Sequence, residues 1–431
     1  MTLEPALTVL AFLVLIKGLV GVLDGIRYNQ YVRSHLNLRP EPWMPRVSVI
    51  LPCKDIDFEL ERNVEAVFRQ VYPFFEVLVV TATAEDPARH LIQRVAAQFP
   101  GHEIRFVIAG FSAERGEKVN NLIQALAYVD STSQVLVFTD SDSRPHFLWL
   151  QELVAPLRDE GIGVSTGYRW YYPAPNNLPS VIRSVWNGSV ATLLGNHGHN
   201  FAWGGSMAIR RNTFDRAKVL SYWQHSLSDD YSMTRAMKDA KLKIHYEPRC
   251  LIGSYGPCTW RELLEWSTRQ MTITKIYSRK LWYLALSSQW SFGLVWWWAL
   301  AGAIVTNWPG AVSPELTSGL VWNSSPWKYP LVVGMLFLMG AVRGIYRVKT
   351  IQQIHPEHRT EIRRYAWSYV LLFPIASTLT AYNLLASAFT SSLNWRGVRY
   401  EVQSPRQMRV VQIQKGSKDR RKDPETQGTF S

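Results

Sequence analysis

The chain has 431 residues, of which 47% are hydrophobic and 13% aromatic, and its formal net charge is +13. The apolar residues gather in blocks with Arg and Lys beside them, which indicates anionic lipid headgroups as partners of the positive charge. The sequence contains no zinc-finger spacing, RNP motif or homeodomain-like helix of the kind that would indicate binding to nucleic acid. The three cysteines are too few for a disulfide framework.

The first apolar block, Ala6 to Val22, is close to the roughly 20 residues that a bilayer core requires. A cleaved signal peptide is the alternative, but no basic region precedes the block and no cleavage site follows it. Arg27, Arg33 and Arg39 come next, so the positive-inside rule places the following domain in the cytoplasm. We therefore expect residues 1–26 to form a transmembrane anchor in the inner or plasma membrane.

Between residues 45 and 258, apolar runs rich in β-branched residues alternate with segments of helical spacing. Such alternation produces βαβ units, so we predict an α/β domain with a Rossmann-like, mostly parallel sheet. In such sheets ligands bind at the carboxyl ends of the strands. The predicted strands are Val47–Leu51, Phe75–Val80, Ile104–Ile108 and Val135–Thr139, and the predicted helices are Phe58–Gln70, Pro87–Gln98 and Lys118–Tyr128.

Two carboxylates, Asp140 and Asp142, directly follow the fourth predicted strand. Because side chains alternate along a strand, both should point to the same side. Mg²⁺ and Mn²⁺ prefer carboxylate oxygens, and such a cation usually keeps positions open for a diphosphate. The alternative is an Asp-rich turn that only ends the strand.

Two further polar residues lie at predicted ends of elements. Asp86 follows the second strand, where it is placed either to bind a base or ribose or to cap the next helix. Lys118 begins a predicted helix, where a positive charge is unfavourable to the helix dipole. An anionic ligand nearby would explain this lysine, and a solvated surface lysine is the alternative.

Asp229 and Asp230 open another predicted helix. Capping explains one carboxylate, and the second is placed to act as a general base. Upstream, Gly204 and Gly205 enter a short predicted strand, where they either let the backbone approach a ligand closely or form a structural turn.

The last third of the chain contains three more apolar blocks. Before them, Trp260–Lys280 interleaves Trp, Leu and Met with basic residues, which is typical of a helix in the headgroup plane or of an amphipathic helix packed on the domain. Leu281–Val305 and Tyr329–Tyr346 are long enough to span a membrane. Tyr365–Thr390 contains Pro374 and many hydroxyl residues, so we predict a broken or re-entrant element that returns to the cytoplasmic face. We expect an interface helix at 259–280, a membrane region at 281–392, and a cytoplasmic segment at 393–431 that ends in the basic tail Lys415–Lys422.

In order and spacing, these residues resemble the inverting glycosyltransferases of family 2 and, more closely, the ceramide glucosyltransferase-like family 21. The resemblance runs from about Val47 to Arg279 and depends on the arrangement of motifs more than on any one of them. The matching motifs are Asp86-Pro87-Ala88, Lys118-Val-Asn-Asn-Leu122, Asp140-x-Asp142, Gly204-Gly205-Ser206 and Asp229-Asp230-Tyr231.

The resemblance implies a GT-A fold and a membrane-bound inverting hexosyltransferase that moves a sugar, glucose by preference, from a UDP-sugar to the hydroxyl group of a membrane lipid. It also implies a metal cofactor, Mn²⁺ or Mg²⁺. For donor binding, the resemblance implies that Asp86 contacts the uracil or ribose, that Lys118 contacts the phosphates, and that Asp140 and Asp142 bind the metal and the diphosphate. It implies further substrate binding by Gly204, Gly205 and Arg269. The implied general base is Asp230, with Asp229 as the alternative.

One motif departs from the family. Gln/Arg-x-x-Arg-Trp is expected after the base, but here Arg269 or Gln270 fits the first position while Thr and Ile replace the Arg-Trp pair. A processive polysaccharide synthase relies on that pair, so this alternative is less favoured. A non-catalytic membrane scaffold is disfavoured because every expected acid is present. Near the end, Trp395–Tyr400 is similar to a Trp-x-Gly-x-x-Tyr segment that follows the last membrane helices in this superfamily.

Overall fold

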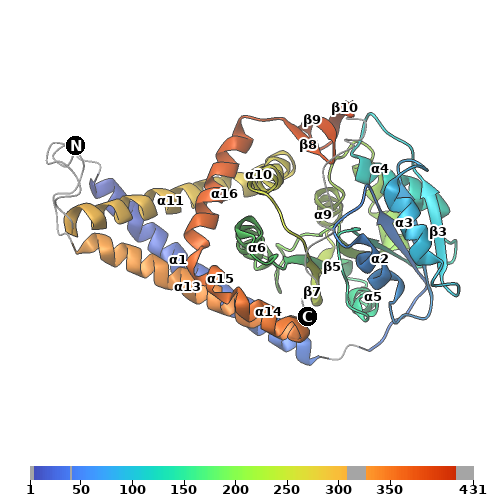
Figure 1. The fold of residues 1–431 in the computed structure, drawn as a ribbon, viewed down its shortest axis with the longest axis horizontal. Helices are drawn as coiled ribbons and strands as arrows, with labels where there is room; N and C mark the ends of the chain where they lie inside the picture. The colour runs from blue at the N-terminus through green and yellow to red at the C-terminus, as the bar shows by residue number, and fades with distance from the viewer. Residues whose placement is uncertain (1–3, 39–40, 308–326, 414–431) are drawn as a thin grey trace, which may run out of the picture.

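The protein is described by a computed structural model that covers residues 4–38, 41–307 and 327–413. A large sheet with helices on both faces forms one end of the molecule, and long helices project from the other end (Figure 1). The predicted basic tail, Lys415–Lys422, lies outside the described residues.

The large sheet has seven strands in the order β3-β2-β1-β4-β6-β5-β7. β6 pairs antiparallel with β4 and β5, and all other pairs in the sheet are parallel, so the predicted mostly parallel α/β sheet is confirmed. The strand order reverses between β1 and β4, which is where a doubly wound sheet opens a ligand crevice. The strands are β1 (Val47–Pro52), β2 (Phe75–Thr81), β3 (Glu103–Ile108), β4 (Val135–Thr139), β5 (Ile162–Tyr171), β6 (Ser206–Arg210) and β7 (Lys243–Ser254).

Helices bury both faces of this sheet. Alternate residues of β1 enter different cores: Val49 and Leu51 pack on one face and Ile50 on the other, as continuous apolar strands do in buried parallel sheets. One face is covered by α2 (Leu60–Phe68), α3 (Pro87–Ala96) and α5 (Trp149–Val154), and the other by α4 (Glu117–Ala125), α7 (Arg211–Arg216), α8 (Val219–Trp223) and α9 (Asp229–Asp239). Short 3-10 turns follow at Leu126–Tyr128 and Ala155–Arg158, and α6 (Leu178–Ala191) and α10 (Trp260–Tyr277) lie toward the projecting helices (Figure 1).

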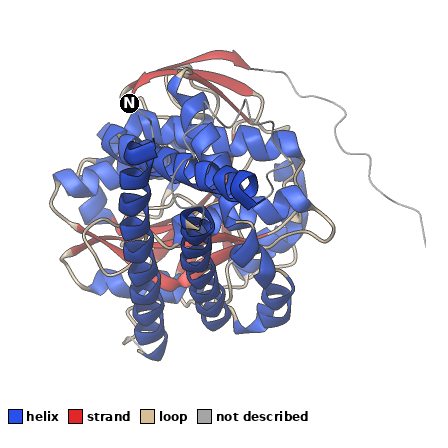
Figure 2. Cartoon of the chain, turned by 90° about the vertical axis from the view of Figure 1, so that its left-hand side faces the viewer, coloured by secondary structure: helices blue, strands red, loops and turns tan. Residues whose placement is uncertain are grey.

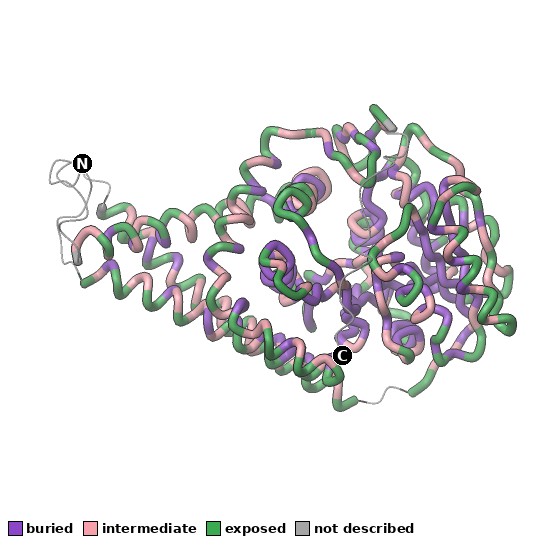
Figure 3. The backbone as a smooth tube through the Cα atoms, in the orientation of Figure 1, coloured by how far each residue is buried: buried purple, intermediate pink, exposed green. Residues whose placement is uncertain are grey.

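The projecting helices are α1 (Glu4–Asn37), α11 (Arg279–Asn307) and α13 (Lys328–Ile354), seen from their own end in Figure 2. Within the described ranges, two helical segments are long and apolar enough to cross a membrane, Pro5–Asn37 and Lys328–Ile354, as judged by length and composition alone. The predicted block Leu281–Val305 is a continuous helix, α11, but is not one of these two. Figure 3 shows that much of the projecting surface is exposed, whereas the sheet is buried.

The last predicted block is a broken helix, as expected. After a 3-10 turn at Pro356–His358 and α14 (Arg359–Arg364), the chain forms α15 (Ala366–Leu371) and α16 (Phe373–Ala388). The interruption falls at Leu372, two residues before Pro374, whose missing N–H and ring disfavour an uninterrupted helix. That this element is re-entrant stays a prediction.

A three-stranded antiparallel sheet follows α16, formed by β8 (Ser392–Trp395), β9 (Val398–Ser404) and β10 (Gln407–Ile413). This sheet contacts the α/β domain, where Val410 N donates a hydrogen bond to Ala113 O at 2.9 Å. The segment Trp395–Tyr400 also lies beside that domain, since the Tyr400 hydroxyl accepts a hydrogen bond from Glu117 N at 3.2 Å.

Buried aromatic contacts join the projecting helices to the large sheet. The hydroxyl groups of Tyr28 on α1 and Tyr246 on β7 lie 3.0 Å apart. His355, just after α13, contacts the Tyr172 hydroxyl through Nδ1 at 2.5 Å and Leu251 O through Nε2 at 2.6 Å. The long helices and the sheet thus share one packed core.

The packing of β5 on β7 can be tested at Gly167. A Cβ there would lie 1.8 Å from Cys250 O and 2.6 Å from Ser206 Oγ, so Gly167→Ala should prevent the two strands from pairing. We expect a large loss of folded protein and a lower Tm by thermal unfolding. Gly101→Ala is the matched control, because nothing lies within 4 Å of its Cβ position. A wild-type Tm for Gly167→Ala would contradict this packing.

Candidate active site

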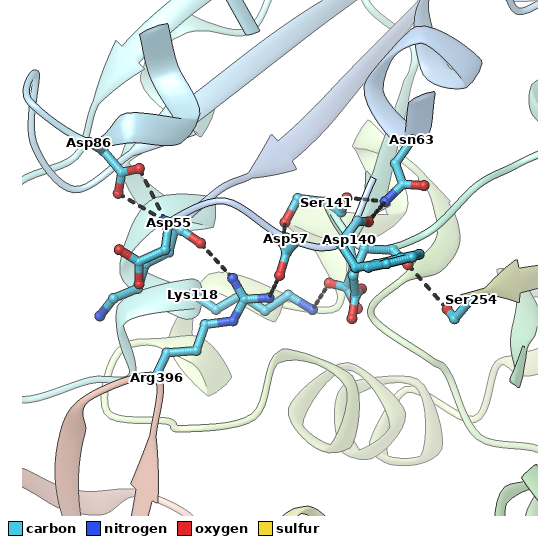
Figure 4. A network of polar contacts seen from close by, with 12 residues as sticks. Asp55, Asp57, Asn63, Asp86, Lys118, Asp140, Ser141, Ser254 and Arg396 are labelled. Carbon is cyan, nitrogen blue, oxygen red and sulfur yellow. Dashed lines mark hydrogen bonds and ion pairs between the residues drawn. The ribbon is translucent and has the colours of Figure 1, made fainter. Parts of the chain in front are cut away.

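A polar cluster lies at the carboxyl ends of β1 and β4, where the strand order reverses (Figure 4). The loop after β1 contributes Lys54, Asp55 and Asp57, and the loop after β4 contributes Asp140 and Asp142. Sheets of this kind bind ligands at this position. The fold therefore places these side chains beside the expected crevice.

Lys118, the second residue of α4, lies at the centre of the cluster. Its Nζ is 2.7 Å from Asp140 Oδ1 and 3.1 Å from Asp229 Oδ2, and its side chain is 17% exposed. Burial alone would lower the pKa of Lys118, but the two carboxylates outweigh it and raise this pKa above its usual value. The alternative of a solvated surface lysine is therefore wrong.

Asp140 and Asp142 converge on one guanidinium, that of Arg169 on β5. Arg169 Nη2 lies 2.8 Å from Asp142 Oδ1 and 3.1 Å from Asp140 Oδ2, and Nη1 lies 3.1 Å from Asp142 Oδ2. The prediction that the two carboxylates point to the same side is confirmed. Burial would raise the pKa of Asp140, but Lys118 and Arg169 together hold it below its usual value.

The two acids of α9 have different surroundings. The residue that caps α9 is Ser228, whose Oγ accepts from Tyr231 N, so the expectation that an aspartate is the cap residue is wrong. Asp230 Oδ1 accepts from Tyr231 N at 2.7 Å and from Ser228 Oγ. The Asp229 side chain is 3% exposed, and burial, opposed by Lys118 and reinforced by Asp230, raises its pKa to about 6.

Gly204 and Gly205 pack directly against these side chains. A Cβ on Gly204 would lie 2.0 Å from Asp229 Oδ2 and 2.7 Å from Lys118 Nζ. A Cβ on Gly205 would lie 2.8 Å from Asp140 Oδ2. The glycines therefore let the backbone approach the charged side chains of the cluster itself.

Two predicted residues lie at the border of the cluster. Asp86 caps α3 by accepting from Ala88 N at 2.9 Å, and it also accepts from Asp55 N at 3.1 Å. Burial, partly offset by these hydrogen bonds, raises the pKa of Asp86. The guanidinium of Arg269 on α10 lies over the ring of Trp395 at 5.5 Å, and burial lowers its pKa to about 10.

Several residues of the cluster were not predicted from the sequence, among them Arg169, Asp57 and Arg396. Asp57 accepts from Ser141 Oγ at 2.6 Å and from Arg396 Nη2 at 2.8 Å. Asp57, like Asp140, is an acid in the loop that follows a buried strand, and this pattern could have identified it from the sequence. Arg169 was detectable as the only charged residue in the strand Ile162–Tyr171.

The candidate metal ligands are Asp140 and Asp142. Among the described residues no group of three or more His, Cys, Asp or Glu side chains could hold a metal ion, so the protein does not provide a complete cage. Paired carboxylates nevertheless fit Mg²⁺ or Mn²⁺ when a bound diphosphate and water supply the other ligands. Arg169 contacts the same oxygens and would compete with such a cation.

Comparison with known families gives one match over most of the chain. The family model described as "Glycosyl transferase family 21" matches residues 11–408.

Individual relatives are more distant. Ceramide glucosyltransferase 1 of Caenorhabditis elegans is 33% identical over 98 residues, which are 23% of this chain and only 21% of that protein. Glycosyltransferase AglE of Haloferax volcanii is 21% identical over 257 residues, 56% of this chain and 81% of that protein. The mannosyltransferase PcManGT of Pyrobaculum calidifontis, solved with GDP-Man and Mn²⁺, is similar over 85% of this chain and 99% of its own, with 18% identity and a TM-score of 0.49.

The close approach at Gly204 can be tested by substitution. Gly204→Ala should push Asp229 and Lys118 apart, because the added methyl group would overlap both side chains. We expect a lower Tm than that of the wild type, measured by thermal unfolding. Gly198→Ala, with nothing within 4 Å of its Cβ position, should behave like the wild type. A wild-type Tm for Gly204→Ala would argue against the close packing of Gly204 on Asp229 and Lys118.

Proposed function

The chain belongs to glycosyl transferase family 21, and on this basis we propose that it is a membrane-bound inverting glycosyltransferase. It moves a sugar, glucose in this proposal, from a UDP-sugar to the hydroxyl group of a membrane lipid. Arg27 and Arg33 follow the first apolar segment, which favours a cytoplasmic catalytic domain. The observation that carries the proposal is the set of carboxylates gathered around Lys118 at the β1–β4 crevice.

The crevice suits a donor that leaves as a diphosphate. Lys118 and Arg169 are charged and largely buried, with side chains 17% and 12% exposed. Fixed charges act more strongly on a developing negative charge where water is excluded, and they need no reorganisation during the reaction. Asp86 supports the same donor, because it links the loop after β1 to the start of α3 at the edge of the crevice.

The Asp140–Asp142 pair would hold a divalent cation, Mn²⁺ or Mg²⁺. The oxygen donors of this pair fit such an ion. When bound, the cation would neutralise charge on the departing nucleoside diphosphate.

Asp230 suits the general base better than Asp229 does. Asp229 is buried and paired with Lys118, whereas Asp230 is only half-buried. Tyr231 N and Ser228 Oγ hold Oδ1 of Asp230, which orients the carboxylate toward the mouth of the crevice in this proposal. Asp230 then takes the proton of the acceptor hydroxyl as its oxygen attacks the anomeric carbon and the sugar–phosphate bond breaks on the opposite face. This single displacement inverts the anomeric centre and needs no enzyme nucleophile.

The acceptor side is assigned to α10. Its outer face exposes Trp260 (54%) and Leu264 (39%) next to Arg261. Apolar and basic residues in this arrangement suit a helix that lies in the headgroup layer. A lipid in the bilayer would then present its hydroxyl group to the cytoplasmic crevice.

Substitutions at Asp142 and Asp230 separate donor binding from chemistry. We expect both Asp142→Asn and Asp230→Asn to lower sugar transfer by about 100-fold or more, the usual scale for loss of a general base or of metal-assisted charge stabilisation. Asp142→Asn should also weaken Mn²⁺-dependent UDP binding. Asp230→Asn should leave UDP binding nearly intact, because a base acts on the chemical step.

UDP affinity with and without Mn²⁺, and transfer from UDP-glucose to a lipid acceptor, are the two measurements. Asp215→Asn, an exposed acid on α7, is the control and should match the wild type. Equal loss of UDP affinity in Asp142→Asn and Asp230→Asn would show that these roles are assigned wrongly.

Use of the acceptor should depend on the bilayer. Enzyme in lipid nanodiscs should transfer sugar faster to a lipid in the membrane than to a short-chain, water-soluble analogue. Trp260→Ser should reduce transfer to the membrane lipid more than transfer to the analogue. Tyr128→Ser removes an equally exposed aromatic side chain, 53% exposed, far along the chain from α10 and should change neither rate. Equal rates with both acceptors in the wild type would count against the interface helix.

A further inference from the structure

We propose that Arg396, in the turn between β8 and β9, binds the diphosphate of the nucleotide-sugar donor and that the sheet β8–β10 forms one wall of the donor site. This inference rests on the proposed function, since it names a further residue for the same donor. It adds a segment that follows the last apolar helix to a site otherwise built from β1, β4, β5, α4 and α9.

The turn gives Arg396 an unusual backbone conformation. Trp395 pairs with Val398, so Arg396 and Gly397 are the two loop residues of the hairpin. Their φ angles are 46° and 75°, a left-handed pair in which Asn or Gly is the favoured first residue. A long side chain at such a position costs conformational free energy, and residues held this way cluster at functional sites.

The side chain of Arg396 points toward Asp55 and Asp57 in the loop after β1 (Figure 4). Nη1 donates to Lys54 O at 2.7 Å, and Nη2 lies 2.8 Å from Asp57 Oδ1. Asp57 in turn accepts from Ser141 Oγ, in the loop that also carries Asp140 and Asp142. Arg396 therefore contacts the loop after β1 and, through Asp57, the loop after β4.

The guanidinium is held in place and still has N–H donors that these two contacts do not employ. A guanidinium carries more N–H groups than the two that these contacts employ, and 34% of the side chain is exposed. Burial would lower the pKa of Arg396, but Asp57 and Asp142 outweigh it and raise this pKa. Arg396 is thus a fixed cation with donors left for an anion, and planar N–H pairs match phosphate oxygens.

The sheet that carries Arg396 is docked by other contacts as well. Tyr400 OH accepts from Glu117 N at 3.2 Å, and Val410 N donates to Ala113 O at 2.9 Å. An apolar cluster also joins Leu393 and Val398 to Ile273 of α10. Removing the guanidinium should therefore leave the sheet in place, so that its role in binding can be measured separately from its role in docking.

The experiment uses the full chain in nanodiscs with Mn²⁺ and compares Arg396→Gln with the wild type. We expect UDP and UDP-glucose to bind about tenfold or more weakly in the variant, because hydrogen bonds between a charged donor and a charged acceptor are stronger than neutral ones. Hydrogen exchange of residues 398–413 should be unchanged. Arg396→Lys should recover part of the affinity, since it keeps the charge and loses the planar pair of donors.

Arg409→Gln is the matched control: Arg409 is on the same sheet, where it pairs with Glu401 and is 70% exposed, so UDP affinity should match the wild type. Unchanged UDP affinity in Arg396→Gln would overturn the inference while the proposed function stands. Faster exchange over 398–413 together with weaker UDP binding would also overturn it, because docking would then explain the loss. If the wild-type protein binds no uridine nucleotide, the proposed donor fails and the inference fails with it.

Discussion

The ammonium group of Lys118 lies between Asp140 and Asp229 and so ties α4, β4 and α9 to one point. All three side chains are largely removed from water, where an isolated charge is very costly. Removing one partner of a buried pair typically costs about 3–5 kcal/mol. Gly204 allows the approach, since any side chain there would occupy the space of the Asp229 carboxylate. The positions of Asp140 and Asp229 depend on this contact.

Two arginines stabilise the close approach of the acids in the loops after β1 and β4. Asp57, Asp140 and Asp142 would repel one another in a crevice that water only partly reaches. Arg169 offsets this repulsion at the β4 loop, and Arg396 offsets it at the β1 loop. These cations hold the acids of both loops in an alternating arrangement of charge, which would suit the diphosphate and cation of the proposed donor. Charges fixed in advance lower the reorganisation needed as the leaving group departs.

The apolar helices are part of the same structure as the crevice. Lys275 of α10 donates to Thr390 O just beyond α16 at 2.7 Å, and Trp282 Nε1 donates to Ser387 Oγ at 2.9 Å. Arg269 of the same α10 lies over Trp395. The helix that lacks the Arg-Trp pair expected for the family thus packs its Arg269 against a Trp of the C-terminal hairpin. In this arrangement, the acceptor side and the donor side of the proposed site meet at residues 395 and 396.

The sequence by itself determined the first four strands, the mostly parallel α/β sheet, the convergence of Asp140 and Asp142, and the anomalous position of Lys118, but it did not indicate β5, β7 or the small sheet β8–β10. The features that it determined follow from the alternation of side chains along a strand and from the dipole of a helix, which act over a few residues. Only the tertiary structure decided which cations neutralise which acids. Arg396 contacts a residue 342 positions away, and Arg169 lies 27 positions from Asp142. With 47 Lys and Arg residues in the chain, local pattern cannot choose among them, because the pairing depends on how distant strands and hairpins return to the same edge of the sheet.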